Sequence, residues 1–425
     1  MHARHTCQAD QLGGTRFARG HMPRCPYQCI ALEHSRRLTE TRSARYRTIV
    51  MSSQQERSAQ RVIDGTAWNE LLDRLRDAGK IIQTGPNDPL TRAEGYRYLS
   101  RLARAGLEAF VEHADPLAPT LRRPVHETIK MGADNPDNFY FHASISGAYD
   151  YVIRGRRNSV HYLQFATLVG HYGQSRGMPP AGTIDGRELQ LEPDGTFELV
   201  ISKERPQSAK NWLRMSDDTG SMMVRQSRLD PKTETLAELT LVRTSGPTTH
   251  DQALTAQKLD EGFGSTGMLV FGASMMFAMW ADGFKDKHVN RLPRFDQALS
   301  DSMGGVPDIA YYHSYWKLAD DEALVIDATP PPCDHWNFQL ENHWMESLDY
   351  QLHRIHTNSK LATMNADGKT VRVVVAHRDP GVPNWIETAG HSFGAMCWRW
   401  VKPESMTSAP EPTTRVVKLA DVRGL

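Results

Sequence analysis

The sequence lacks an excess of charge of either sign, because its 50 Lys and Arg residues balance its 50 Asp and Glu residues. This balance argues against a dedicated surface for nucleic acid or for an anionic membrane, and we expect neither as a partner. The sequence also lacks the motif G-x-x-x-x-G-K-[ST]. The spacing G-x-G-x-x-G occurs at residues 262–267, but within a helical stretch and not after a strand. The spacing G-x-S-x-G occurs at residues 173–177 and 390–394, but neither leads from a strand into a predicted helix. P-loop, dinucleotide-binding and α/β-hydrolase chemistry are therefore disfavoured, and no cofactor is predicted.

Cysteine is scarce in the body of the chain. Of the five cysteines, three lie in the first thirty residues, and only Cys333 and Cys397 follow, on what we interpret as separate strands. Two such cysteines do not form a disulfide framework. This pattern favours a reducing compartment, so we expect a cytoplasmic protein.

Long hydrophobic runs are also missing. The most apolar stretch, residues 268–284, contains Gly, Ser and Asp, and it is shorter than the roughly 20 residues that cross a bilayer. We predict a buried helix and no membrane span. Met275 and Met279 in this stretch are also candidates for the wall of a lipophilic pocket, because thioether side chains fit irregular shapes.

The pattern of residues divides the 425-residue chain into segments. Residues 1–50 contain nine Arg and no Lys, and they lack apolar periodicity, which predicts a disordered or over-called extension before Met51. The capping-box match from Thr91 to Glu94 indicates a helix that starts there. The remaining predicted segments are a helical N-terminal region over 51–125, a β-sandwich over 126–245, a helical insertion over 246–305, a C-terminal sandwich over 306–402 and a tail with little fixed structure over 403–425.

The stretch from His335 to Trp344 alternates strictly between two kinds of side chain. One side carries His335, Asn337, Gln339, Glu341 and His343, and the other carries Trp336, Phe338, Leu340, Asn342 and Trp344. This period of two predicts a β-strand whose aromatic side joins a sandwich core. The side with His, Asn and Gln is suited to orienting hydrogen bonds, and we interpret it as a binding face.

Three segments of the sequence carry a family resemblance: residues 211–230, 336–350 and 377–400. Together they resemble the bacterial domain of unknown function 1214 family, whose members often follow a domain of the related 1254 family. The resemblance implies a mainly β fold with helical N-terminal and inserted segments. It implies two antiparallel β-sandwiches, the first immunoglobulin-like and the second jelly-roll-like, and little about activity.

A metal site is the first chemical possibility for the second sandwich. His335 and His343 share a strand face but lie about 26 Å apart along an extended strand, so they cannot bind one ion without a bend. A site would need one of them with His377, His391 or a carboxylate from another strand. We predict no metal.

Acid/base chemistry is the second possibility. Asp349 follows the binding face, where it could also form a structural ion pair with Arg354. His391 lies between glycines in a loop, where it could face a sandwich mouth or only bond the backbone. Arg225 and Arg399 interrupt apolar strands, so each needs an anionic ligand or an internal ion pair, and we favour the internal pair.

The leading prediction is an enzyme that performs cofactor-independent hydrolysis, elimination or hydration on a lipophilic or aromatic small molecule. The predicted catalytic residues are His335, Asp349 and His391. The predicted ligand-binding residues are Asn337, Gln339, His343, Trp385, Arg399, Met275 and Met279. The alternatives are a non-catalytic module that binds a small molecule or carbohydrate on exposed tryptophans, and a structural protein, with a homo-oligomer left open. Buried tryptophans beside a pocket would favour the enzyme.

Overall fold

A computed structural model describes residues 53–170, 179–248, 254–302 and 308–425. The extension predicted over residues 1–50 lies outside these ranges. The chain divides into two units, Met1–Arg57 and Ser58–Leu425, and the second unit contains all the elements described below. The fold is mainly β with helices in the N-terminal and inserted regions, as predicted.

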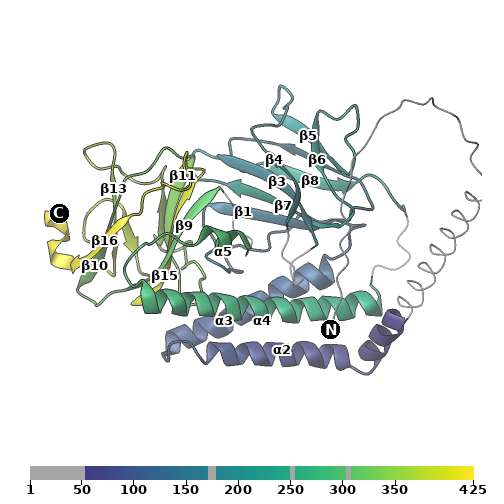
Figure 1. Ribbon diagram of the computed structural model, residues 1–425, viewed down its shortest axis with the longest axis horizontal. Coiled ribbons are helices and arrows are strands. Elements are labelled where there is room, and N and C mark those ends of the chain that lie inside the picture. The colour runs from purple at the N-terminus through teal and green to yellow at the C-terminus, as the bar shows by residue number, and fades with distance from the viewer. Residues whose placement is uncertain (1–52, 171–178, 249–253, 303–307) are drawn as a thin grey trace, which may run out of the picture. The chain divides into compact units, whose positions relative to one another are not determined.

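Three long helices pack together through apolar side chains of Ala78, Ile82, Tyr98, Leu102, Val270 and Ala278. They are α2 (Thr66–Ile82), α3 (Pro89–Leu107) and α4 (Ala256–Lys287), which lie side by side in Figure 1. Short helical segments follow at η1 (Glu108–Glu112) and α5 (Gln297–Ser302). The predicted capping box is wrong, because Asp88 caps α3 by accepting a hydrogen bond from the Thr91 backbone and the helix begins at Pro89.

Helix α4 is longer than the apolar stretch within it. Its 32 residues make it long and apolar enough to cross a membrane by length and composition, which is weak evidence because core helices meet the same test. Its Val270 and Ala278 pack on α2 and α3, and the helix also contacts the second sandwich. The absence of a membrane span stays a prediction.

The first sandwich is built from strands β1 to β8. Its two sheets have the strand orders β1-β7-β3-β4 and β6-β5-β2-β8, and they enclose a core that includes Phe165, Leu199 and Val224. The strands are β1 (Asn138–Ser144), β2 (Tyr151–Arg156), β3 (Tyr162–Val169), β4 (Pro180–Asp185), β5 (Thr196–Ser202), β6 (Asn211–Arg214), β7 (Thr219–Ser227) and β8 (Glu238–Arg243).

The second sandwich is built from strands β9 to β16. Its sheets, β12-β11-β15-β9 and β14-β13-β10-β16, enclose a larger aromatic core that includes Trp336, Phe338 and Trp398. The strands are β9 (Ile309–Lys317), β10 (Glu322–Ala328), β11 (His335–Leu340), β12 (His356–Asn358), β13 (Val371–Ala376), β14 (Trp385–Glu387), β15 (Phe393–Val401) and β16 (Thr413–Lys418).

The structure differs from the sequence prediction in two details of the sheets. The sheets are not purely antiparallel, because β6 pairs with β5 and β14 pairs with β13 in parallel. The predicted tail is ordered beyond Lys402, because β16 pairs with β10 and the following η2 (Leu419–Gly424) buries Val422. An edge strand such as β16 exposes most of its side chains, so its sequence gives little alternating signal.

Candidate functional site

The predicted binding face lies on the outer side of the sheet β12-β11-β15-β9. His335, Asn337 and Gln339 are each at most 3% exposed, and they point away from the sandwich core. Neighbouring strands extend this face, because Gln339 pairs with His356 of β12 and with Cys397 of β15. We call these side chains, with the paired Asn358 and Arg399, the polar face.

The segment from Ala133 to Asp137, which leads into β1, covers the polar face. Gln339 donates through Nε2 to the Asp134 carbonyl at 2.9 Å, and Arg399 donates through Nη2 to the Ala133 carbonyl at 2.5 Å. Asn358 donates to the Asp137 carboxylate at 2.9 Å. The polar face is therefore the surface where the second sandwich meets the chain entering the first.

The two arginines of apolar strands have neutral hydrogen-bond partners instead of the expected ion pairs. Arg399 donates to Gln339 Oε1 at 2.8 Å, and Arg225 donates to Gln164 Oε1 at 3.3 Å and lies over the Tyr140 ring. Within the described ranges, neither guanidinium forms an ion pair with a carboxylate. The prediction of internal ion pairs is therefore wrong.

Among the described residues, other polar atoms of this face lack hydrogen-bond partners. In the part of the chain that the structure describes, both side-chain polar atoms of Asn337 and Glu341 Oε2 are buried without a hydrogen-bond partner. Burial raises the pKa of Glu341 to about 8, although the charge of Arg399 opposes the shift. Burying polar groups without partners costs free energy, so these atoms lower the stability that the face contributes.

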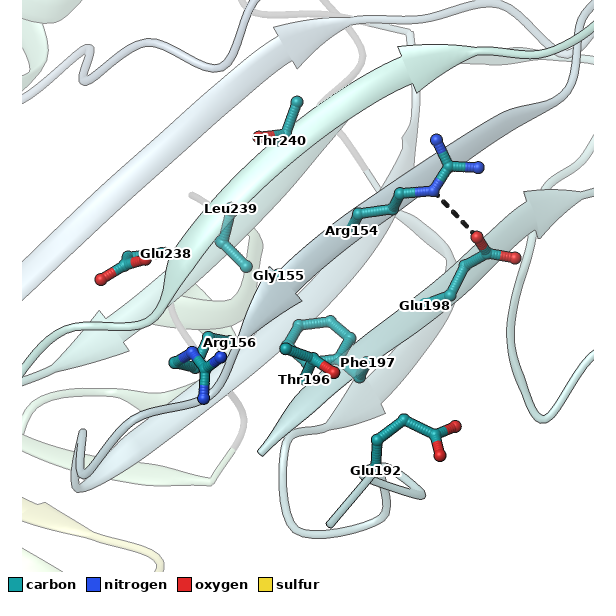
Figure 2. Close-up of a pocket in the computed structure, with 10 residues that line it drawn as sticks. All are labelled: Arg154, Gly155, Arg156, Glu192, Thr196, Phe197, Glu198, Glu238, Leu239 and Thr240. Atoms are coloured by element: carbon teal, nitrogen blue, oxygen red, sulfur yellow. Dashed lines mark hydrogen bonds and ion pairs between the residues drawn. The ribbon is translucent and has the colours of Figure 1, made fainter. Parts of the chain in front are cut away.

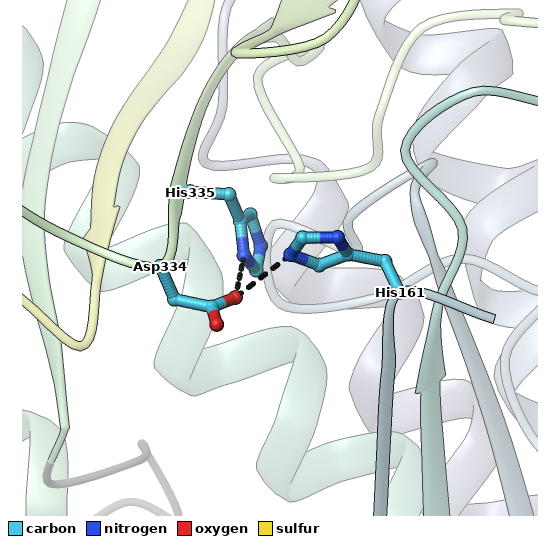
Figure 3. Close-up of side chains that lie close together, drawn as sticks. All are labelled: His161, Asp334 and His335. Atoms are coloured by element: carbon cyan, nitrogen blue, oxygen red, sulfur yellow. Dashed lines mark hydrogen bonds and ion pairs between the residues drawn. The ribbon is translucent and has the colours of Figure 1, made fainter. Parts of the chain in front are cut away.

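At the His335 end of the polar face, three side chains join the two sandwiches (Figure 3). Asp334 Oδ2 accepts hydrogen bonds from His161 Nε2 at 2.9 Å and from His335 Nδ1 at 2.8 Å. Burial favours a raised pKa for Asp334, but these two hydrogen bonds outweigh it and lower the pKa. Sequence reasoning missed His161 because 173 residues separate it from Asp334.

At the other end, a cavity of about 370 Å³ opens beside β12. Within it, His356 Nε2 lies 3.2 Å from Asp137 Oδ1, and the side chain of Asp137 is 3% exposed. Since the carboxylate can only accept, Nε2 carries the proton of this hydrogen bond, and in the neutral imidazole Nδ1 is then the acceptor. The lining residues are Glu127, Pro136, Asp137, Phe139, Arg228, Pro231, Tyr350, Gln351, His356 and Leu361.

A cation and aromatic rings complete the lining of this cavity. The Arg228 guanidinium lies 5.0 Å from the centroid of the Phe139 ring, and no ion pair joins it to a carboxylate among the described residues. Tyr350 also lines the cavity, and Lys130 Nζ, which lies behind the lining, is 4.4 Å from its ring centroid. The cavity thus combines an apolar wall, an unpaired guanidinium and a His–Asp dyad.

Two of the predicted catalytic residues lie elsewhere. Asp349 is exposed and accepts a hydrogen bond from the Gln351 backbone. His391 Nε2 lies 3.1 Å from Glu94 of α3. Burial favours a lowered pKa for His391, but the Glu94 hydrogen bond outweighs it and raises the pKa. His391 therefore connects the helices to the second sandwich. Within the described ranges, its hydrogen bonds go to Glu94, Thr388 and Ala389, and not to another predicted site residue.

Four predicted ligand-binding residues are also separated from the polar face. His343 follows the end of β11 and hydrogen-bonds the Tyr315 hydroxyl at 3.0 Å. Trp385 donates to the Ala376 carbonyl in the opposite sheet. Met275 and Met279 are 42% and 65% exposed on α4. Of the predicted catalytic and ligand-binding residues, the structure therefore brings together only His335, Asn337, Gln339 and Arg399.

A second hollow lies on the outer side of β2, β5 and β8 (Figure 2). Its charged residues lie at the surface, and the 3.0 Å ion pair between Arg154 and Glu198 joins side chains that are 63% and 53% exposed. This hollow has the character of a solvated sheet surface, and we do not assign it a role.

The fold and the site define a two-sandwich β protein with a helical layer and a cavity where the sandwiches meet. Residues 167–229 match a family described as a protein of unknown function, DUF1214. An uncharacterized protein from Burkholderia cenocepacia of known crystal structure is 46% identical, with a TM-score of 0.79 over 85% of this chain and 99% of that chain. The chain therefore belongs to the DUF1214 family, which confirms the resemblance seen in the sequence.

A more distant solved structure is the VPA0106 protein from Vibrio parahaemolyticus. It is 12% identical, with a TM-score of 0.47 over 82% of this chain and all of that chain. This likeness is too weak to support an argument. No match was found among curated proteins.

Proposed function

We propose that the protein is an enzyme that performs acid/base chemistry with its own side chains on a small anionic molecule with an apolar or aromatic body. The observation that carries the proposal is the Asp137–His356 dyad in the wall of the 370 Å³ cavity, beside the unpaired Arg228. The proposal keeps the predicted reaction class and moves the acid/base group from His335 and His391 to His356.

His356 is the proposed proton acceptor. Asp137 holds the Nε2–H group, which fixes the ring and leaves Nδ1 to take a proton from a bound molecule. Asn358 donates to the same Asp137 oxygen and so positions the carboxylate. After proton transfer, the buried carboxylate would stabilise the imidazolium, as the carboxylate does in other His–Asp pairs.

Arg228 is the proposed anchor for the negative group. A guanidinium presents several N–H donors in a plane, and this geometry suits a carboxylate. The Phe139 ring supports the guanidinium, while Pro136, Pro231 and Leu361 supply apolar wall. These features favour a substrate with a carboxylate at one end and an apolar or aromatic group at the other.

The non-catalytic alternative receives less support. Stacking on carbohydrate requires exposed tryptophan rings, but Trp336, Trp344, Trp398 and Trp400 are all at most 3% exposed. Trp385 is half-buried and lies in the sheet that faces away from the cavity. The proposal retains a cytoplasmic location and a small-molecule ligand without nucleic acid or membrane as partner.

Phenylpyruvate is a suitable probe because it has an aromatic body, a carboxylate and exchangeable benzylic protons. Calorimetry should detect binding to the wild-type protein. Arg228→Gln should weaken binding roughly tenfold or more, since a charge-assisted hydrogen bond contributes about 1.5–3 kcal/mol. Arg154→Gln, at the solvated surface hollow, is the matched control and should bind normally.

The chemical step is tested by exchange of the benzylic protons in D₂O, followed by proton NMR. A base removes one benzylic proton to give the enolate, and solvent returns a deuteron to the same carbon. His356→Gln should slow the protein-catalysed exchange about 100-fold or more while retaining binding. Binding without catalysed exchange would support the non-catalytic reading, and an absence of binding would refute both.

A further inference from the structure

Three potential metal ligands meet within the polar face, two strands away from His356. Cys397 of β15 pairs directly with His313 of β9, and the Glu341 backbone N–H donates to the Ala395 carbonyl just after β11. One ligand atom from each of His313, Glu341 and Cys397 lies within 4.8 Å of the other two. Cys397 Sγ and His313 Nε2 are 3.9 Å apart.

All three side chains are buried, and their polar atoms are poorly satisfied. Glu341 and Cys397 are fully buried, and His313 is 7% exposed. Among the described residues, Glu341 Oε2 has no hydrogen-bond partner, while Glu341 Oε1 accepts from Gln339 at 3.0 Å. His313 Nδ1 also has none in these ranges, and it is the other ring nitrogen, Nε2, that lies next to Cys397. The rings of Phe284, Phe295 and Tyr311 surround His313, so water has little access to it. A buried carboxylate oxygen without a partner, next to a thiol and an imidazole, requires an explanation.

We infer that His313, Glu341 and Cys397 bind a divalent metal ion of the zinc class. A thiolate and a carboxylate would neutralise the two charges of the ion, so the buried site would carry no net charge apart from the nearby Arg399. Sulfur, nitrogen and oxygen are the donors that zinc takes in proteins. Three protein ligands leave one tetrahedral position for another donor.

The spacing of the donors agrees with this assignment. Zinc bonds of about 2.3 Å to sulfur and about 2.0 Å to nitrogen place these atoms roughly 3.6 Å apart in a tetrahedral site. The observed distance of 3.9 Å therefore needs a shift of only a few tenths of an ångström. Because two ligands belong to the adjacent strands β9 and β15 and the third directly follows β11, the ion would tie the strands of the polar face together without taking part in chemistry at His356.

The cluster in Figure 3 provides the comparison within the same molecule. His161, Asp334 and His335 also have ligand atoms within 4.8 Å of one another. There, both rings already donate to Asp334 Oδ2, and Arg187 lies 3.4 Å from the other oxygen. The hydrogen bonds satisfy this cluster, and it has no thiol, so we assign it no metal.

The test is to produce the full chain in medium supplemented with Co²⁺, because a buried site is filled during folding. We expect one cobalt ion per chain by elemental analysis and a thiolate-to-cobalt charge-transfer band in the near ultraviolet. Cys397→Ser should abolish the band, while Cys333→Ser, at the other thiol of the body, and His161→Gln should retain it.

Folded wild-type protein without cobalt, or with cobalt but without the thiolate band, would overturn the inference. A band lost in Cys333→Ser and kept in Cys397→Ser would also overturn it. The wild-type spectrum decides the question even if Cys397→Ser does not fold. This test does not use phenylpyruvate. Failure of the metal inference can therefore be distinguished from failure of the proposed function.

Discussion

The ion pair between Arg101 and Glu346 offers a quantitative test of how the helices hold the second sandwich. Arg101 of α3 donates to Glu346 Oε1 at 2.6 Å, and the Glu346 side chain is 1% exposed. Replacing Arg101 by Leu leaves the carboxylate buried without its cation. Breaking a buried pair in this way costs about 3–5 kcal/mol of unfolding free energy, so we expect that loss at pH 8 in urea titrations followed by circular dichroism.

The loss should depend on pH with a definite sign. Burial raises the pKa of Glu346 and Arg101 lowers it, so removing Arg101 raises the pKa further. A carboxyl group with a raised pKa in the folded state destabilises the protein as pH rises. The cost of Arg101→Leu should therefore be smaller at pH 5 than at pH 8, and adding Glu346→Gln should restore most of the stability.

A matched control lies on α2, where Lys80 pairs with Asp77 at 2.7 Å with both side chains exposed. Lys80→Gln should cost less than about 1 kcal/mol. If Arg101→Leu costs no more than this control, or if its cost is the same at both pH values, the buried carboxylate does not depend on Arg101 and the reasoning fails.

Two other predictions concern stability. Burial lowers the pKa of His142 from its usual value near 6.5 to about 3. As pH falls, the unfolded chain therefore takes up the proton first. Between pH 6.5 and pH 3, this group lowers the unfolding free energy by up to roughly 1.4 kcal/mol per pH unit. Acid titrations of His142→Gln should show a shallower slope, and an unchanged slope would contradict this. A Cβ on Gly394 would lie 2.1 Å from the Glu341 carbonyl oxygen, whereas one on Gly264 of α4 meets nothing within 4 Å. Gly394→Ala should lower the thermal midpoint by several degrees, and Gly264→Ala should leave it unchanged or raise it; equal effects would contradict the packing described.

The sequence predicted the parts of the fold that depend on local periodicity. The alternation from His335 to Leu340 is a strand with Trp336 and Phe338 in a core, as expected. The strand ends earlier than the alternation predicts, because β11 stops at Leu340 and the chain then turns, with a positive φ of 56° at Met345. The turn places His343 against Tyr315 instead of on the polar face.

The parts of the site that sequence reasoning missed depend on contacts between distant segments. Asp137 and His356 are separated by 219 residues, and nothing in either local pattern joins them. Glu94 matched a capping box, but Asp88 caps the helix and Glu94 faces His391 instead. Which polar residues share a cavity follows from how the sandwiches meet, and a periodicity within one strand carries no information about that.

The most direct test of the account is a crystal structure of the protein with phenylpyruvate. We predict density for the probe in the cavity beside β12, with the carboxylate at Arg228 and the benzylic carbon facing Nδ1 of His356. A cavity that stays without the probe under conditions where calorimetry shows binding, or a probe that sits at Arg154 on the outer face of the first sandwich, would contradict the assignment of the site.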